Sequence, residues 1–346
     1  MPNTRPIYEQ KDPISHILHR PDMYVGSIKI QQFYNEWIYK NNKIIQKSSV
    51  RYPDGLKRIF IEPISNAVDN VWRSQEAGVS CKKIMINIDK KTGETSVWND
   101  GLTIPIERSK QNIWNPELIF GNLRTSSNYN DNEKRYTSGR NGLGVKLTNI
   151  FSTQFKIETY DTVTGLLYSQ EWSNNMKTVS KPSIRKKKMK RGYTKVSWIP
   201  DFEKFKLKNY TRDIIGLFHK YVVDIAMITQ IPVILNDTKL PVKSLKDYGK
   251  LYSNETVNSL VIKTEDCEVM FMENELNEFQ AIAFTNGVIN KEGGCHVSAW
   301  SDAIFKPLLQ KFNKKDKPNV NTKDLKQYFR LIINCKVPNP VFSDQS

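Results

Sequence analysis

Three glycines in six positions, Gly139, Gly142 and Gly144, lead into a helical pattern that continues to residue 150. In such a loop the backbone N–H groups can face phosphate oxygens at the start of the following helix. The run is not a P-loop, because Lys146 comes one place late after Gly139 and no Ser or Thr follows it, and it lacks the G-x-G-x-x-G dinucleotide pattern. We therefore expect a phosphate-wrapping loop of another kind, to which Arg140 and Lys146 add cationic donors.

A polar stripe runs along one predicted helix. In residues 56–78 the apolar side chains recur at helical spacing, and a turn is expected before them at residues 53–55. Glu62, Asn66 and Asn70 fall within a stripe about 80° wide, at about 100° per residue. Such a stripe can pair a general base with an Mg²⁺ ligand, because a Glu can polarise a water and an Asn oxygen can complete the metal shell. The alternative is a helix face that simply meets solvent.

Two short polar segments could complete a nucleotide site. In VWNDGLTIP, residues 97–105, a strand end would present Asn99 or Asp100 to the exocyclic amine of an adenine. In TSSN, residues 125–128, hydroxyl and amide groups suit contacts with ribose and phosphate. Taken alone, each segment can also be a plain polar turn.

The remaining patterns predict an α+β fold. Pro63 is expected in the first turn of its helix or at a kink, since it cannot donate a helical hydrogen bond. Residues 82–100 read as a β-hairpin, and a domain boundary is expected near 206–212, before a helix over 211–228. Further strands are predicted over 155–161, 166–172, 193–199, 261–264, 267–273, 280–288 and 330–337, with a helix over 300–312.

The length and the net charge of the chain limit the classes of protein to which it can belong. The 346 residues suggest two domains, and no run of about 18 apolar residues predicts a membrane span. The formal net charge of +16 indicates a polyanionic partner without naming it. The four cysteines are far apart and lack zinc or redox spacing, which predicts a reduced, intracellular protein.

Taken in order, these segments resemble a known pattern. The chain is similar to the ATPase region of type IIA DNA topoisomerases of the eukaryotic kind, members of the GHKL ATPase superfamily. The resemblance rests on IYEQKDPISHILHRPDMYVGS, EPISNAVDN, WNDGLTIP, the densest run PELIFGNLRTSSNYNDNEKRYTSGRNGLGVKLTNIFSTQF, LNDTKLPVKSLKDY, FTNGVINKEGGCHV and VPNPVFSDQS. It implies a Bergerat-type mixed α/β sandwich followed by a smaller α/β transducer domain.

The resemblance also implies roles for the residues of the helix and the strand end. Glu62 corresponds to the general base that activates the attacking water, and Asn66 to the Mg²⁺ ligand. Asn70 and Asn99 correspond to residues that approach the nucleotide, Asn99 at the adenine-reading position with Asp100 beside it. ATP and Mg²⁺ are therefore the expected ligands.

Further implied roles fall on loops and on the N-terminal arm. Ser126, Ser127 and Asn128 would contact ribose and phosphates. The lid around the phosphates would consist of Gly139, Arg140, Asn141, Gly142, Leu143, Gly144, Val145 and Lys146. Tyr8 would reach the nucleotide of the other protomer, so the expected assembly is a homodimer that exchanges its arms when nucleotide binds.

Two positions depart from the family pattern. Thr103 stands where the Asp/Asn-Gly-x-Gly-Ile-Pro turn has its second Gly. Gln345 and Ser346 represent the Gln-Thr-Lys loop, so the lysine that senses the γ-phosphate is expected at position 347. We therefore expect an exchange arm over 1–20, an ATP-binding domain over 21–208 and a transducer over 209–346, in a fragment without the DNA-cleavage domains.

Two basic segments could contact double-stranded DNA. Residues 183–195 hold seven Lys or Arg, which suit either a solvated hairpin turn or phosphate contacts. A second loop aligns with the position where the family has lysines that face DNA, here Lys311, Lys314, Lys315 and Lys317.

Other functions and the compartment stay open at this point. The alternatives are a chaperone or DNA-repair ATPase of the same superfamily, and a basic DNA-binding module with a vestigial nucleotide pocket. The Asn- and Lys-rich composition suits an AT-rich cellular genome or that of a large DNA virus. The expected location is the nucleus in the first case and the cytoplasm, in a virus factory, in the second.

Overall fold

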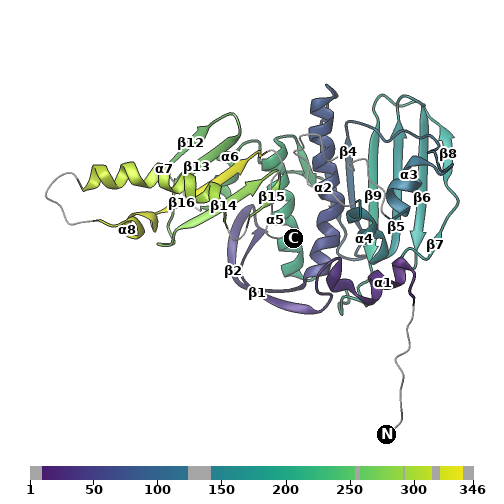
Figure 1. Ribbon diagram of the computed structural model, residues 1–346, viewed down its shortest axis with the longest axis horizontal. Coiled ribbons are helices and arrows are strands. Elements are labelled where there is room, and N and C mark those ends of the chain that lie inside the picture. The colour runs from purple at the N-terminus through teal and green to yellow at the C-terminus, as the bar shows by residue number, and fades with distance from the viewer. Residues whose placement is uncertain (1–9, 124–141, 254–257, 291–292, 314–319, 338–346) are drawn as a thin grey trace, which may run out of the picture.

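The computed structural model describes residues 10–123, 142–253, 258–290, 293–313 and 320–337. These residues form an elongated molecule with a β-sheet toward each end (Figure 1). Between the sheets lie helix α5 (Arg212–Thr229) and a hairpin of β1 (Ile30–Lys40) and β2 (Lys43–Pro53). The combination of mixed sheets and helices confirms the predicted fold class.

The larger sheet runs in the order β11-β10-β3-β4-β9-β5-β6-β7, with β8 also paired to β6. Strand β10 lies parallel to β3, and the other described pairs of this sheet are antiparallel. The strands are β3 (Ile84–Ile88), β4 (Thr95–Asp100), β5 (Ser152–Asp161), β6 (Leu166–Ser173), β7 (Thr178–Val179), β8 (Ser183–Lys186), β9 (Tyr193–Pro200), β10 (Val233–Leu235) and β11 (Thr238–Lys239).

Helices cover one face of this sheet. Val97, Val196 and Ile157 lie side by side on β4, β9 and β5 and are buried in the main core, which fixes the covered face. Onto the sheet pack α2 (Asp54–Glu76) at β4, α4 (Gly144–Ile150) at β5 and β9, and α3 (Asn115–Gly121) at β6. The preceding chain forms α1 (Pro13–His19), which Asp12 caps, and the short 3-10 turn η1 (Pro21–Met23).

Helix α2 begins earlier than predicted. The expected turn at 53–55 is wrong, because the helix starts at Asp54. Pro63 lies well inside the helix rather than in its first turn. Its nitrogen cannot donate to the carbonyl of Ile59, and the hydroxyl of Thr148 on α4 donates to that oxygen instead, at 2.9 Å. The helix therefore tolerates Pro63 because a neighbouring helix supplies the missing donor.

The β1–β2 hairpin was not foreseen from the sequence. Its two strands pair from Ile30 opposite Pro53 to Lys40 opposite Lys43, and Asn41 and Asn42 form the turn with positive φ angles of 51° and 58°. Asn tolerates this left-handed conformation, which a two-residue hairpin of this twist requires. The hairpin packs against α5.

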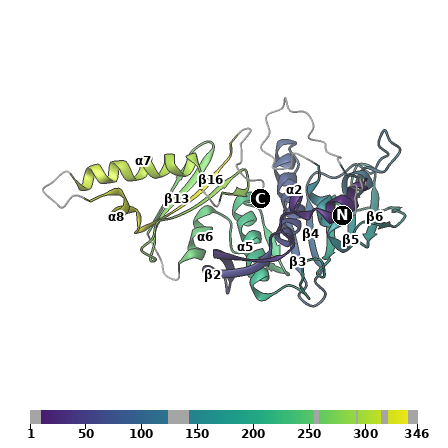
Figure 2. The same ribbon diagram turned by 60° about the horizontal axis from the view of Figure 1, so that its bottom comes forward.

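The smaller sheet runs in the order β12-β13-β16-β14-β15. One face packs on α7 through Val269, Leu331 and Ile333, while Met270, Met272 and other alternate residues join the main core. The elements are α6 (Leu245–Gly249), η2 (Lys250–Tyr252), β12 (Ser259–Lys263), β13 (Cys267–Glu273), β14 (Gln280–Thr285), β15 (Val288–Ile289), α7 (Cys295–Phe312), α8 (Thr322–Lys326) and β16 (Phe329–Cys335). Figure 2 shows α7 and α8 extending away from the larger sheet.

The change from one sheet to the other falls later in the chain than the expected boundary. Strands β10 and β11 follow residue 208 but belong to the larger sheet, so the change lies between Lys239 and Ser259. The division at 208 and 209 stays a prediction about domains. In the described ranges, no helix is long and apolar enough to cross a membrane.

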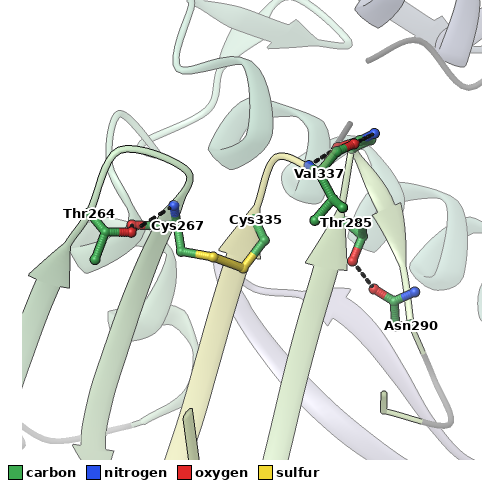
Figure 3. Close-up of a disulfide and its surroundings, with 7 residues drawn as sticks. Thr264, Cys267, Thr285, Asn290, Cys335 and Val337 are labelled. Carbon is green, nitrogen blue, oxygen red and sulfur yellow. Dashed lines mark hydrogen bonds between the residues drawn. A yellow bond between two sulfur atoms is a disulfide. The ribbon is translucent and has the colours of Figure 1, made fainter. Parts of the chain in front are cut away.

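The expectation of four reduced cysteines is wrong for two of them. Cys267 and Cys335 are joined by a disulfide although 68 positions separate them in the sequence (Figure 3). They stand opposite each other on the antiparallel strands β13 and β16, a proximity that spacing along the chain does not reveal. Cys81 is a buried free thiol and Cys295 an exposed one.

Candidate active site

The predicted polar stripe lies on α2 as expected. Asn66 is exposed, whereas Glu62 and Asn70 are half-buried between the helix and its neighbours. Asp69, which the helical spacing placed beside Glu62, is buried and only 4% exposed. The stripe therefore presents one carboxylate followed by two amides, one and two turns later, along a single helix face.

Glu62 sits in a largely dry environment. Its carboxylate pairs with the Nε of Arg58, one turn earlier, at 2.6 Å, and its side chain is 14% exposed. Burial raises the pKa of the Glu62 carboxyl above its usual range, and the Arg58 guanidinium offsets only part of that shift. A carboxylate of raised basicity suits proton abstraction near neutral pH.

The start of α4 lies directly against Glu62. A Cβ on Gly144 would overlap the Oε2 atom of Glu62, so a larger residue at this position would displace the carboxylate from its place in this structure. The bond from Thr148 to the Ile59 carbonyl holds α4 on α2 within one helical turn of Glu62. The last part of the predicted lid, from Gly142 to Lys146, is thus fixed beside the candidate base.

Lys146, expected to add a cationic donor for the phosphates, has a partner within its own loop in this structure. Its side chain is buried, and its ammonium donates to the carbonyl of Gly142. Burial lowers the pKa of Lys146 to about 8. The ammonium stays within the loop that is expected to wrap the phosphates.

The loop after β4 is fastened to α2 on the other side of the stripe. The amide of Asn70 donates to the carbonyl of Leu102 at 3.2 Å, and the N–H of Leu102 donates to Ser74 Oγ at 2.8 Å. Gly101 has a φ of 122°, and a Cβ there would stand 2.5 Å from Ser74 Oγ. Asn70 therefore shapes the wall of the site in this structure through a backbone contact.

Asn99 and Asp100 lie on opposite faces of the sheet. Because strand residues alternate, Asn99 points with Val97 toward the helices, and Asp100 points with Trp98 away from them. The carboxylate of Asp100 accepts from the N–H groups of Lys82 and Lys83 and from Arg191. The structure thus brings Asn99, but not Asp100, to the helix-covered side where Glu62 lies.

Thr103, the departure from the family's turn, has a partner of its own. Its hydroxyl donates to Asp161 Oδ1 at 3.0 Å, and the same buried carboxylate accepts from Thr164 Oγ1 at 2.8 Å. The polar side chain at this position thereby ties the turn to the end of β5.

Sequence reasoning missed the residues that position the site. They are Arg58, Ser74, Thr148 and Asp161. Only Arg58 left a signal, since Arg and Glu four positions apart on a helix are neighbours. The other three act through contacts between segments distant in the sequence.

Several predicted residues lie outside the described ranges. They are Tyr8, Ser126, Ser127, Asn128, Gly139, Arg140, Asn141, Lys314, Lys315, Lys317 and Gln345. Of the predicted DNA-facing lysines, Lys311 is described, and it is exposed in the last turn of α7.

The chain resembles known proteins along nearly its whole length. A family model described as DNA gyrase B matches residues 234–346. The chain is 38% identical to the DNA topoisomerase 2 of Invertebrate iridescent virus 6, an alignment that covers 99% of this chain and 32% of that protein. The chain thus spans about a third of the length of this relative.

Two solved structures share the fold. The ATPase region of Saccharomyces cerevisiae topoisomerase II is 39% identical with a TM-score of 0.86, and the match covers 98% of this chain and 88% of that one. The ATPase and transducer domains of DNA topoisomerase II from Balamuthia mandrillaris are 32% identical, also with a TM-score of 0.86, over 98% and 87% of the two chains.

Proposed function

The chain belongs to the family of ATPase regions of type II DNA topoisomerases, and from this premise we propose that it binds and hydrolyses Mg-ATP as the gate of a longer DNA topoisomerase. The observation that carries the proposal is the half-buried Glu62, whose pKa is raised by burial and which lies against the start of α4. The proposed activity of the longer protein is ATP-dependent passage of one DNA segment through another.

In this proposal Glu62 takes a proton from the water that attacks the γ-phosphate. The ion pair with Arg58 keeps the carboxylate in one orientation, and it limits how far burial can raise the pKa of Glu62. General base catalysis of this kind contributes about 10²–10⁴-fold to a rate.

Mg²⁺ fits the same face of α2. Asn66 exposes an amide oxygen one turn from the Glu62 carboxylate, and amide and carboxylate oxygens are the hard donors that Mg²⁺ takes together with phosphates and water. Asn66 would hold the ion, which when bound would neutralise phosphate charge. Asn99, buried on the helix-covered side, would read the adenine, and backbone N–H groups from Gly142 to Val145 would face the phosphates.

Dimerisation belongs to the proposal too. Nucleotide binding would favour a homodimer in which Tyr8 reaches the partner's nucleotide, and Ser126, Ser127 and Asn128 would contact ribose and phosphates. Lys311 with Lys314, Lys315 and Lys317 would face double-stranded DNA held between the protomers.

The test separates nucleotide binding from hydrolysis. We expect Glu62→Gln to lose about 10²–10⁴-fold in ATP turnover and to keep its affinity for a non-hydrolysable ATP analogue with Mg²⁺, measured by calorimetry. Glu76→Gln, at the exposed end of the same helix, is the matched control and should hydrolyse ATP normally. Hydrolysis by Glu62→Gln at the wild-type rate would refute the assignment of the base, and no analogue binding by the unmodified chain would refute the function.

A further inference from the structure

We propose that a basic pocket on the helix-free side of the larger sheet is a second contact for double-stranded DNA, which binds the phosphodiester backbone. The pocket, about 480 Å³ in volume, is formed by Lys82, Lys83, Lys190 and Arg191 around Trp98 and Tyr193. The inference rests on the proposed action on DNA but concerns the face of the sheet opposite to the ATP site, because Trp98 points away from α2.

The pocket belongs to a face of the sheet with its own small cluster. Tyr160, Leu167 and Tyr193 pack together with Trp98 and Met189, separately from the main core. Leu167, Tyr160 and Tyr193 lie in one row across the sheet, because Leu167 pairs with Tyr160 and Tyr160 pairs with Tyr193. Described helices pack on the opposite face, against residues such as Val97.

Backbone contacts hold the basic segment in place. The Tyr160 hydroxyl donates to the carbonyl of Lys187 at 3.0 Å and accepts from the N–H of Met189 at 3.2 Å. Asp100 accepts from the N–H groups of Lys82 and Lys83, at 2.7 and 3.1 Å, so its carboxylate orders the segment on the other side. A freely solvated hairpin turn would not have these anchors, and a preorganised surface loses less entropy when it binds.

The charges of the pocket are mostly uncompensated. Arg191 pairs with Asp100 at 3.1 Å. Within the described parts of the chain, neither Lys82, Lys83 nor Lys190 has a carboxylate oxygen within 4.0 Å. Among the residues that line the pocket, four cations face one carboxylate, that of Asp100, and a second carboxylate, Glu158, accepts from the Tyr193 hydroxyl at 2.6 Å. The remaining surplus of positive charge attracts a polyanion.

The basic surface continues beyond the pocket. Exposed side chains of the same run extend it along β8, and Arg185 on that strand pairs with Leu167 of the same row. From β8 to β3 the row crosses five strand spacings of about 4.8 Å, or about 24 Å. The row has cationic side chains at its two ends, Arg185 on one side and Lys82 and Lys83 on the other. Positive charges spaced over this length suit a regular polyanion such as a DNA duplex better than a single small anion.

The aromatic side chains favour the backbone over the bases as the ligand. The ammonium of Lys83 lies 5.3 Å from the centre of the Trp98 ring, and Tyr193 stacks on the same indole at 5.7 Å. A base could stack on Trp98 only by displacing these neighbours, whereas phosphates can meet the lysines directly. Contacts of this kind carry no sequence information and weaken with salt.

The experiment measures how the affinity of the 346-residue chain for a short labelled duplex depends on salt. Because each phosphate contact contributes about 0.9 to the slope of log K against log salt, we expect Lys82→Ala/Lys190→Ala to reduce that slope by about 1.8 and the affinity at 0.1 M salt by more than tenfold. Lys82→Arg/Lys190→Arg should keep most of the binding. The matched control, Lys177→Ala/Lys208→Ala, removes the same charge from exposed positions outside the pocket and should change little.

Other outcomes would overturn the inference. An unchanged slope, an equal loss in the control variant, or a loss confined to a single-stranded probe would each exclude a duplex contact here. ATP turnover without DNA should be the same in all variants, since these lysines do not touch the ATP site. In one outcome the unmodified chain hydrolyses ATP and binds duplex DNA, and Lys82→Ala/Lys190→Ala binds duplex equally well; only the inference would then fail. If the unmodified chain neither hydrolysed ATP nor bound duplex, the proposed function would be refuted as well.

Discussion

The hydroxyl of Thr148 is predicted to stabilise the junction of α2 and α4 by replacing the donor that Pro63 lacks. Thr148 is fully buried, and its hydroxyl donates to the Ile59 carbonyl at 2.9 Å. In Thr148→Val the shape of the side chain is kept, but this carbonyl is left buried without a donor. An unsatisfied buried acceptor costs about 1–3 kcal/mol, which lowers the thermal midpoint of a unit of about 200 residues by roughly 2–12 °C.

Thr229→Val is a matched control for this prediction. Thr229 is also buried, but its hydroxyl donates to a carbonyl of its own helix, that of Ile225 one turn earlier, at 2.7 Å. The Ile225 carbonyl keeps its helical N–H partner after the substitution, so the expected loss is below about 1 kcal/mol. Thermal unfolding followed by circular dichroism compares the two variants, and Thr148→Ser should retain most of the stability. Equal midpoints for Thr148→Val and Thr229→Val would refute the role given to the hydroxyl.

Three further predictions concern charge and covalent bonding. Arg58→Ala should move the acid limb of the pH–rate profile for ATP turnover to higher pH. Burial raises the pKa of Glu62 and Arg58 lowers it, so removing Arg58 raises that pKa further, and the base works only when deprotonated. An acid limb that did not move would contradict this prediction. Lys220→Met leaves the Asp224 carboxylate buried without its ion-pair partner, 2.8 Å away, and should cost about 3–5 kcal/mol in urea unfolding, most of which a second change of Asp224 to Asn should restore. Cys335→Ser removes the disulfide that closes a loop with a sequence separation of 68, and this should lower the free energy of unfolding by roughly 4 kcal/mol. Reductant should destabilise the smaller sheet of the unmodified chain but should not change the unfolding of this variant.

The sequence predicted those parts of the site that depend on local order. The stripe of Glu62, Asn66 and Asn70 follows from helical periodicity alone, and the close approach of Gly144 is consistent with the glycine run. Strand alternation could also have separated Asn99 from Asp100, had the end of the strand been placed correctly. Local spacing therefore predicts which face a residue occupies once its element is known.

The errors concern contacts between distant segments. The position of Pro63 depends on a hydroxyl 85 positions later, and the disulfide depends on the pairing of β13 with β16. The β1–β2 hairpin lacks a Gly at its turn, and its two asparagines take the positive φ values that a Gly would have signalled. Contacts of this kind depend on tertiary packing, which composition and periodicity in a single sequence do not encode.

Buried polar contacts connect the helix that carries the site with the smaller sheet. Ser65, on α2 between Glu62 and Asn66, shares a hydrogen bond of 3.1 Å with Tyr221 on α5. Lys220, the residue before Tyr221 on α5, forms an ion pair with Asp224. The other carboxylate oxygen of Asp224 accepts a hydrogen bond from Tyr248 of α6 at 2.6 Å.

The connection continues to β16. Tyr248 shares a hydrogen bond of 2.7 Å with Tyr252, whose carbonyl accepts from the buried guanidinium of Arg330 at 3.3 Å. Separating α5 from α6 would break the hydrogen bond from Tyr248 to the buried Asp224 carboxylate, which keeps Lys220 of its own helix as partner, at a cost of about 1.5–3 kcal/mol. A displacement of α2 relative to the smaller sheet is therefore less costly if α5 and α6 move together, because these hydrogen bonds are then kept.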